Sequence, residues 1–304
     1  MMDGLIAATY TPMHADTSLN LDLVPRYAEY LMGNGVKGAF INGSTGDFAS
    51  LSVAERMAVT TAWALNKTPN LFVIDQVGHT SLKEAKEMAR HAADKVDGIA
   101  ALAPFYFRIS NLDKLVEYCG EIAACAPNIP FYYYHIPVLT GANFNMIDFL
   151  ELVTPRIPNL GGIKFTNNNL IDYRYSKDFN NGSANILFGF DEIFLASLPF
   201  GAKGWVGSTY NHLAPLYLSI LDAFNSHDQK LAAELQEKSM KFVDILNGKG
   251  GFNGAAKSFM KALGVDCGPS RFPHTTLNDA QIKEAMSQLE ALGIAPYLCK
   301  LPLI

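Results

Sequence analysis

The chain has 304 residues, of which 49% are hydrophobic and 17% are charged, a composition that is typical of a globular protein with a large core and excludes a disordered chain. The formal net charge is −5, without a basic stripe or a run of like charges. We therefore expect no nucleic-acid partner and no binding to an anionic membrane surface.

The sequence indicates a cytoplasmic protein. Its first residues lack the basic start and apolar run of a signal peptide, and no window approaches a membrane span. The four cysteines form no CxxC pair and are expected to be reduced thiols. The seven histidines are scattered, with no HExxH, no HxH and no His/Cys cluster, so we expect no bound catalytic metal.

Short apolar runs alternate with amphipathic segments of about 12–16 residues that carry apolar residues at helical spacing. The runs predict eight strands, over residues 4–11, 38–42, 71–77, 98–107, 130–136, 160–166, 186–190 and 204–208. Strands that alternate with helices pair in parallel, and eight such units favour a closed (β/α)8 TIM barrel. An open doubly wound sheet is the competing fold. It usually has a glycine-rich turn after its first strand, where this chain has Tyr10-Thr11-Pro12.

Several helices begin at recognisable capping residues. Ser52 and Ser81 are each followed three residues later by a glutamate, which fits the capping box. Asn111 and Asn145 are also well placed to cap a helix.

After the eighth strand only helical patterns remain, which predicts an extension of about three helices. Lys249-Gly250-Gly251 separates the first helix from the second, and Asn278 is expected to cap the third. We therefore predict a barrel domain over residues 1–226 and a C-terminal helical extension over residues 227–304.

The most informative stretch is the sixth strand, Gly161-Gly162-Ile163-Lys164-Phe165-Thr166. An ammonium in a buried run is costly to desolvate, and burial lowers the pKa of a lysine. A neutral amine is a nucleophile toward ketones and aldehydes. Alternation puts Lys164 and Thr166 on one face and two apolar side chains on the other. This favours a lumen-facing lysine over an edge-strand lysine with its head in water. We expect Gly161 and Gly162 to leave room beside it.

Side chains at the C-terminal ends of barrel strands face the active site. The second strand ends in Gly43-Ser44-Thr45-Gly46, where two glycines flank two hydroxyls and leave backbone amides free to bind an anion. A carboxylate fits better than a phosphate, because barrel phosphate sites usually follow strands seven and eight. An ordinary tight turn is the other interpretation of this loop.

The fifth strand contains Tyr132, Tyr133, Tyr134 and His135. Alternation points Tyr132 and Tyr134 to one face and Tyr133 and His135 to the other. A tyrosine near the barrel mouth can transfer a proton, and Tyr134 is the candidate. We expect Tyr132 and Tyr133 to pack between the sheet and the helices, and His135 to be structural.

Two further strand ends carry polar residues. The seventh strand is followed by Asp191 and Glu192, which could bind sugar hydroxyls or lie in the first turn of a helix, where the macrodipole favours acids. The residues alone favour the helix-dipole interpretation. The eighth strand ends in Gly207-Ser208-Thr209-Tyr210-Asn211, a second loop with hydroxyls and free amides.

The order of these motifs resembles the N-acetylneuraminate lyase / dihydrodipicolinate synthase superfamily. The resemblance covers essentially the whole chain. It implies a class I aldolase-like (β/α)8 barrel that forms a Schiff base with pyruvate, without a metal or an organic cofactor, and a homotetramer. The motifs that carry it are Gly43-Ser44-Thr45-Gly46, the Tyr134 strand with Pro137 and Gly141, Gly162-Ile163-Lys164, and Gly204 to Asn211.

The resemblance also implies roles for individual residues. Lys164 would form the Schiff base, and Tyr134 would relay protons, assisted by Tyr106 from a neighbouring subunit. Ser44 and Thr45 would hold the pyruvyl carboxylate. The residues that would bind the sugar portion are Thr166, Gly189, Asp191, Glu192 and Ser208.

Within the superfamily the chain is most similar to the N-acetylneuraminate lyase branch, which cleaves N-acetylneuraminate reversibly to N-acetylmannosamine and pyruvate. Dihydrodipicolinate synthases usually carry an arginine two residues after the position of Pro137, where this chain has Leu139. Asp47 departs from the glutamate that the family commonly has, which concerns the support of the carboxylate loop. The alternatives are an aldolase for another 2-keto-3-deoxy sugar acid and a non-catalytic barrel that binds sugar or pyruvate.

Overall fold

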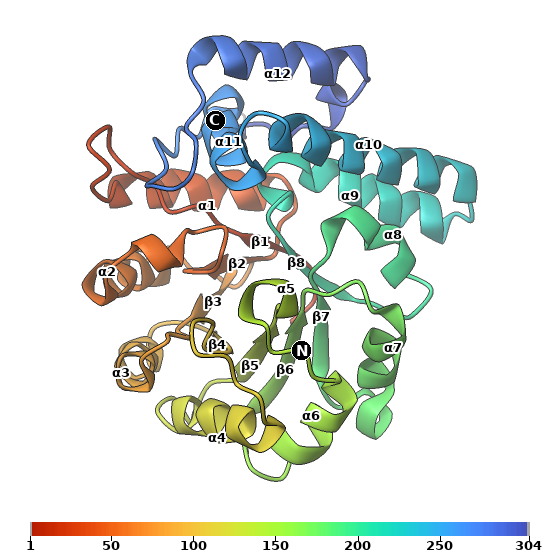
Figure 1. The fold of residues 1–304 in the computed structure, drawn as a ribbon. Coiled ribbons are helices and arrows are strands. Elements are labelled where there is room, and N and C mark those ends of the chain that lie inside the picture. Colours follow the sequence, from red (N-terminus) through yellow and green to blue (C-terminus); the bar gives the residue numbers. More distant parts are fainter. Residues whose placement is uncertain (1, 303–304) are drawn as a thin grey trace.

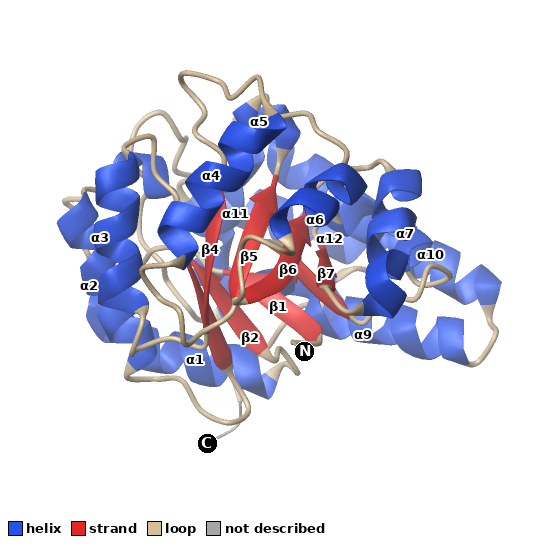
Figure 2. Ribbon diagram, turned by 90° about the horizontal axis from the view of Figure 1, so that it is seen from below, coloured by secondary structure: helices blue, strands red, loops and turns tan. Residues whose placement is uncertain are grey.

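Within residues 2–302, which the computed structural model describes, eight strands form one closed parallel barrel (Figures 1 and 2). Each strand pairs with its neighbour in chain order, and β1 and β8 close the ring. The predicted (β/α)8 fold is confirmed. The strands are β1 (Gly4–Ala8), β2 (Gly38–Ile41), β3 (Phe72–Gln76), β4 (Gly98–Leu102), β5 (Phe131–His135), β6 (Leu160–Phe165), β7 (Asn185–Phe188) and β8 (Gly204–Gly207).

Helices surround the barrel and cover the outer face of its strands (Figure 2). They are α1 (Val24–Gly33), α2 (Val53–Ala64), α3 (Leu82–Ala92), α4 (Leu112–Ala123), α5 (Pro137–Thr140), α6 (Met146–Val153), α7 (Leu170–Asp178), α8 (Phe194–Ser197) and α9 (Tyr210–Asn225). Short 3-10 helices occupy Leu21–Leu23, Phe48–Ser50, Phe179–Gly182, Asp191–Ile193, Met260–Leu263 and Ala295–Tyr297.

All eight strands end earlier than the sequence predicted, and β1 and β4 do so by three and five residues. The strands expected over 4–11 and 98–107 stop at Ala8 and Leu102. The run over 98–107 continues through Pro104, which has no N–H to donate to a neighbouring strand, and Pro12 directly follows the run over 4–11. Apolar composition alone therefore does not mark the point at which strand pairing ends.

Most of the predicted helix caps are confirmed. The N–H of Glu55 donates to Oγ of Ser52 at 3.2 Å, and the Glu55 carboxylate accepts from the N–H of Ser52 at 2.8 Å, which completes a capping box on α2. Asn111 caps α4 by accepting from the N–H of Lys114 at 3.3 Å.

Two caps differ from the prediction. Ser81 caps α3, but the box is not completed, because the Glu84 carboxylate lies 3.1 Å from Nδ1 of His79. Asn145 precedes α6 without capping it. The first N–H of α6 donates instead to the carboxylate of Asp172 in α7, at 2.9 Å. A side chain from another helix thus replaces the local cap that the sequence suggested.

The barrel separates two apolar regions. A small cluster fills the lumen, and a larger core lies between the strands and the surrounding helices. Alternate side chains along each strand point to one region or the other. The residues of the lumen cluster include Ile6, Phe40, Ile74, Leu187 and Val206.

After α9 the described chain forms the three predicted helices, α10 (Gln229–Asn247), α11 (Phe252–Phe259) and α12 (Asp279–Ala291). α10 packs along α9, and α12 forms the outer layer at the top of Figure 1. Gly250 and Gly251, both with positive φ, separate α10 from α11, and Asn278 caps α12 in a capping box. The division of the chain into two domains at residue 226 stays a prediction.

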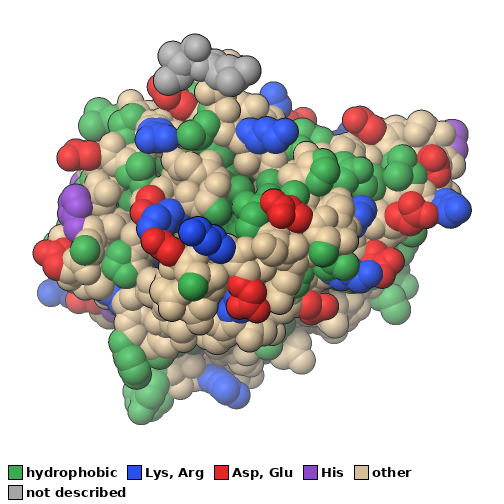
Figure 3. All heavy atoms as spheres, turned by 90° about the horizontal axis from the view of Figure 1, so that it is seen from above, with side chains coloured by type: hydrophobic (Ala, Val, Ile, Leu, Met, Phe, Trp, Pro, Cys, Tyr) green, Lys and Arg blue, Asp and Glu red, His purple; other side chains and the backbone are tan. Residues whose placement is uncertain are grey.

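The surface on the side of α12 carries acidic and basic side chains intermixed (Figure 3). This matches the even distribution of charge along the sequence. Among residues 2–302, no helix is both long and apolar enough to cross a membrane.

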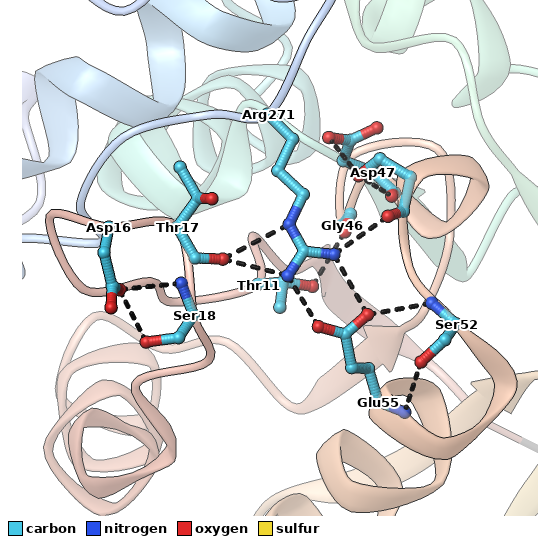
Figure 4. A network of polar contacts seen from close by, with 10 residues as sticks. Thr11, Asp16, Thr17, Ser18, Gly46, Asp47, Ser52, Glu55 and Arg271 are labelled. Carbon is cyan, nitrogen blue, oxygen red and sulfur yellow. Dashed lines mark hydrogen bonds and ion pairs between the residues drawn. The ribbon is translucent and has the colours of Figure 1, made fainter.

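Arg271, in the segment between α11 and α12, ties the extension to the barrel loops (Figure 4). Its guanidinium donates to the carbonyl oxygens of Thr17 and Ser50, each at 2.9 Å. It also forms a bidentate ion pair with the Glu55 carboxylate, with N···O distances of 2.5 and 2.9 Å. Hydrogen bonds from Arg271 are the main cause that lowers the pKa of Glu55 to about 2. One carboxylate thus joins the extension to the start of α2.

Replacing Glu55 with glutamine is expected to change how stability depends on pH. Folding lowers the pKa of Glu55 from 4.5 to about 2, so its charge stabilises the native state fully above pH 4.5. This contribution is lost as the pH falls toward about 2. The difference in melting temperature between the wild type and Glu55→Gln should therefore shrink over that range. Glu117→Gln, in an exposed pair with Lys114, is the control. A difference that stays constant in acid would contradict the assignment.

Candidate active site

A cavity of about 230 Å³ opens among the C-terminal ends of the strands. In a (β/α)8 barrel this end of the strands carries the active site. Nine of the ten residues selected from the sequence line the cavity, while Tyr106 lies elsewhere. The nine are Ser44, Thr45, Tyr134, Lys164, Thr166, Gly189, Asp191, Glu192 and Ser208.

Lys164 lies on β6, which pairs with β5 on one side and β7 on the other, so the edge-strand interpretation is wrong. The residue is 4% exposed, and its Nζ lies 3.8 Å from the ring centroid of Tyr134 and 4.0 Å from that of Phe40. Burial lowers the pKa of Lys164, and the smaller influences of Tyr134 and Asp191 oppose this. The amine is thereby held closer to its neutral, nucleophilic form.

Gly161 and Gly162 serve the packing of the strands. Gly162 has a φ of +153°, and a Cβ there would lie 1.9 Å from the carbonyl oxygen of Asn185 in β7. A Cβ on Gly161 would lie 2.8 Å from the side chain of Pro130. Close approach of neighbouring chain segments, rather than the room that we expected beside Lys164, is what requires these glycines.

The alternation predicted for β5 is confirmed, with one correction. Tyr134 faces the lumen, where its hydroxyl lies 3.5 Å from Oγ of Ser44. Tyr133 faces outward into the larger core. Tyr132 also lies in the lumen, where its hydroxyl donates to Asn185 at 3.2 Å. The prediction that Tyr132 packs between the sheet and the helices is therefore wrong.

His135 points away from the cavity. Its ring packs against Tyr133 and Phe165 in the region between the barrel and the helices. Burial lowers the pKa of His135 to about 4, so the ring is neutral at pH 7. This placement agrees with the structural role that we expected.

The loop after β2 combines unpaired backbone donors with two hydroxyls. Within the part of the chain that the structure describes, the N–H groups of Ser44 and Thr45 donate to no protein acceptor. The carbonyl oxygen of Ser44 is engaged, because it accepts from the N–H of Asp47 at 3.0 Å. Free N–H groups beside a buried amine form a suitable site for a small anion such as a carboxylate.

Asp191 is buried, and one of its two carboxylate oxygens accepts hydrogen bonds. Its Oδ2 accepts from the N–H and Oγ1 of Thr209, at 3.0 and 2.6 Å, while Oδ1 has no partner among the described residues. Asp191 and Glu192 lie in the first turn of the 3-10 helix Asp191–Ile193, as the helix-dipole interpretation expected. The carboxylate of Asp191 also binds Thr209, which directly precedes α9. Burial raises the pKa of Asp191 and of Glu192 beside it. Asp191 and Glu192 both line the cavity.

Thr166 and Gly189 meet at the wall of the cavity. Oγ1 of Thr166 is buried and has no partner within the described residues. A Cβ on Gly189 would lie 2.4 Å from this oxygen, so glycine is needed there. Ser208 lines the same cavity.

Tyr106 does not line this cavity. It follows β4 and is 78% exposed, next to Phe107, which is 84% exposed. A second cavity, of about 470 Å³, adjoins the first through Ser44 and Thr45 and is mainly apolar. The apolar side chains that line it include Phe48, Leu102, Phe105, Leu139 and Phe252.

Sequence reasoning missed residues that support the site without lining the first cavity. Nδ2 of Asn211 donates to the carbonyl oxygens of Ala8 and Ser208, at 2.8 and 2.7 Å, and so joins the ends of β1 and β8. Its position three residues after Ser208 was a local signal. Asn253 donates to the carbonyl oxygen of Ser44 from 209 residues away, which no local pattern could reveal.

Comparison with known proteins identifies the family. The model of the dihydrodipicolinate synthetase family matches residues 1–292. The chain belongs to this family. Curated relatives include the N-acetylneuraminate lyase of Rattus norvegicus, which is 37% identical over 97% of this chain and 94% of that protein.

Solved structures of N-acetylneuraminate lyases are similar to this chain over nearly its whole length. The Proteus mirabilis N-acetylneuraminate lyase is 35% identical, with a TM-score of 0.92 over 96% of this chain and 99% of that chain. The Ruminococcus gnavus sialic acid aldolase is 28% identical, with a TM-score of 0.89 over 97% of this chain and 99% of that chain.

Asp47, which stands where the family commonly has glutamate, directly follows the loop after β2 and contacts Ser50 and His274. Its φ is +54°, and its carboxylate accepts from Oγ of Ser50 at 2.7 Å and lies 3.5 Å from Nε2 of His274. Among residues 2–302, no three His, Cys, Asp or Glu side chains are grouped so that they could hold a metal ion.

Gly162→Ala is expected to destabilise the protein by about 1–3 kcal/mol or more, because the added Cβ meets a backbone carbonyl that the barrel holds in place. Gly120→Ala in α4 is the matched control, since its Cβ would meet nothing closer than 3.9 Å. That change should be neutral or stabilise by about 0.5–1 kcal/mol. Urea unfolding measures both. Equal stabilities for the two variants would contradict the strand-packing role of Gly162.

Proposed function

We propose that this chain is a class I aldolase that cleaves N-acetylneuraminate reversibly to N-acetylmannosamine and pyruvate. The observation that carries the proposal is the buried amine of Lys164, which lies in one cavity with Tyr134 and the free backbone donors of Ser44 and Thr45. Membership of the family and the similarity to N-acetylneuraminate lyases support it.

The reaction begins at the nitrogen of Lys164. The neutral amine attacks C2 of the open-chain keto acid, and Tyr134 gives its hydroxyl proton to the C2 hydroxyl, which leaves as water and forms a protonated imine. Tyr134 accepts the proton of the C4 hydroxyl, the C3–C4 bond breaks, and its electron pair moves into an enamine. N-acetylmannosamine leaves with the new aldehyde. Protonation of the enamine at C3 and hydrolysis of the imine return pyruvate and free Lys164.

The substrate is held at both ends. Ser44 and Thr45 bind the carboxylate of the keto acid through hydroxyls and backbone N–H groups. Asp191, Glu192 and Ser208, which line the cavity together, bind the hydroxylated tail. Thr166 and Gly189 orient the sugar near the bond that breaks. The reaction as written needs no metal or organic cofactor.

Leu139 favours the lyase over the synthase reaction. It stands where dihydrodipicolinate synthases usually have an arginine for a second carboxylate, and it lines the adjoining apolar cavity. A leucine offers no charge for such a group. The acids after β7 are suited instead to the hydroxyls of a sugar.

Tyr106 acts from a neighbouring subunit in this proposal. A tyrosine needs a neighbouring group to exchange protons near neutral pH, and Tyr134 has Ser44 at 3.5 Å. The exposed Tyr106 and Phe107 of a second copy would fit the apolar cavity beside Ser44. We therefore propose a homo-oligomer, a homotetramer by analogy with the family. The cytoplasmic location stays a prediction from the sequence.

Lys164→Ala is expected to lower pyruvate release from N-acetylneuraminate by at least about a thousandfold, because the nucleophile is lost. Lys257→Ala is the control: Lys257 is also buried, with a pKa lowered to about 8, but its Nζ donates to the carbonyl oxygen of Pro269 outside the cavity. Circular dichroism should show folded protein in both cases. A folded Lys164→Ala variant with wild-type rates, or a wild type inhibited by a strong chelator, would refute the mechanism.

A mixture of two inactive variants is expected to recover activity if Tyr106 acts in trans. In a heterodimer of Lys164→Ala and Tyr106→Phe chains, one of the two sites has both Lys164 and the partner's Tyr106. Random pairing makes about half of the dimers mixed, so about a quarter of wild-type activity should return. Co-expression with two affinity tags isolates the mixed species. Purified heterodimers without recovered activity would show that Tyr106 does not serve the partner's site.

A further inference from the structure

We infer that the C-terminal extension positions the carboxylate-binding loop through Asn253, and that Thr11 does so from the opposite side. Both side chains hold carbonyl groups of Gly43-Ser44-Thr45-Gly46, which leaves the N–H groups of the loop to the substrate. The inference rests on the proposed function, because that function assigns the substrate carboxylate to this loop.

Asn253 lies in the first turn of α11, at the edge of the second cavity. Its Nδ2 donates to the carbonyl oxygen of Ser44 at 3.3 Å and lies 3.3 Å from Nε2 of His274. His274 in turn lies 3.5 Å from Oδ1 of Asp47, the residue that ends the loop. The extension therefore contacts Ser44 within the loop and Asp47 directly after it.

Thr11 holds the loop from the end of β1. Its Oγ1 donates to the carbonyl oxygen of Gly46 at 2.7 Å. A Cβ on Gly46 would lie 3.2 Å from the carbonyl oxygen of Thr9, so the loop packs closely against this segment. The two contacts come from segments that are far apart in the sequence and do not depend on each other.

These contacts matter because a peptide group presents either its N–H or its carbonyl in a given direction. The N–H groups of Ser44 and Thr45 have no acceptor in the described protein, so nothing within it fixes them directly. If the peptide groups of this loop turned, carbonyl oxygens would face the substrate carboxylate and repel it. The carbonyl of Ser44 shares its peptide group with the N–H of Thr45, so the donor from Asn253 favours the orientation that presents this N–H to an anion. The carbonyl of Gly46 shares its peptide group with the N–H of Asp47, which donates to the same oxygen of Ser44, so Thr11 supports that orientation through Asp47.

Steady-state kinetics in the direction of synthesis tests this role, because pyruvate and N-acetylmannosamine are varied separately. Asn253→Leu keeps the approximate size and removes the donor. We expect its KM for pyruvate to rise about three- to tenfold, the effect of one neutral hydrogen bond, while its KM for N-acetylmannosamine stays unchanged. Asn253→Gln, which retains the amide, should recover part of the affinity for pyruvate.

Asn278→Ala is the control for a purely structural effect. It removes the cap of α12 in the same extension without touching the loop, so it should lower the melting temperature and leave both KM values unchanged. An Asn253→Leu variant that is folded and has an unchanged KM for pyruvate would overturn the inference. So would an equal rise in both KM values.

Thr11→Val keeps the test decisive if Asn253→Leu does not fold. It removes the donor to Gly46 and preserves the branched shape, and the same selective rise in the KM for pyruvate is expected. An unchanged KM in folded Thr11→Val would then overturn the inference. Failure of the proposed function has a different signature, since the wild type itself would neither condense pyruvate with N-acetylmannosamine nor release it from N-acetylneuraminate.

Discussion

The site depends on the removal of one amine from water. Lys164 lies on a strand that is paired on both sides, above an apolar lumen, with the rings of Phe40 and Tyr134 at about van der Waals distance from its Nζ. An isolated strand or an open edge would let the same side chain reach solvent and keep its charge. Closure of the barrel is therefore part of the chemistry, because desolvation is the main cause that lowers the pKa of this lysine.

Polar groups lie around that amine, but within residues 2–302 no carboxylate forms an ion pair with it. Asp191 is held by Thr209 at the start of α9, and the loop after β2 is held by side chains from β1 and from the extension. Each group keeps unpaired atoms where it lines the cavity. A ligand with a carboxylate and several hydroxyls would pair with these groups.

Much of this could be predicted from the sequence because it follows from local patterns. Apolar periodicity predicted the strands, and alternation predicted that Lys164 and Tyr134 face the lumen. The polar residues that follow the strands were predicted to line one site at the C-terminal end of the barrel. Other features depend on contact between distant segments. Asp172 in α7 replaced Asn145 as the cap of α6, and the carboxylate of Asp191 binds Thr209 before α9. The link from Asn253 to Ser44 likewise has no signature in either neighbourhood.

The most direct test of the central claim is to reduce the wild-type protein with borohydride in saturating pyruvate and to map the product by peptide mass spectrometry. The account predicts that the peptide containing Lys164 gains the mass of a reduced pyruvyl group, whereas Lys257, the other buried lysine with a lowered pKa, stays unmodified. An unmodified Lys164, with the protein intact and pyruvate present, would contradict the account.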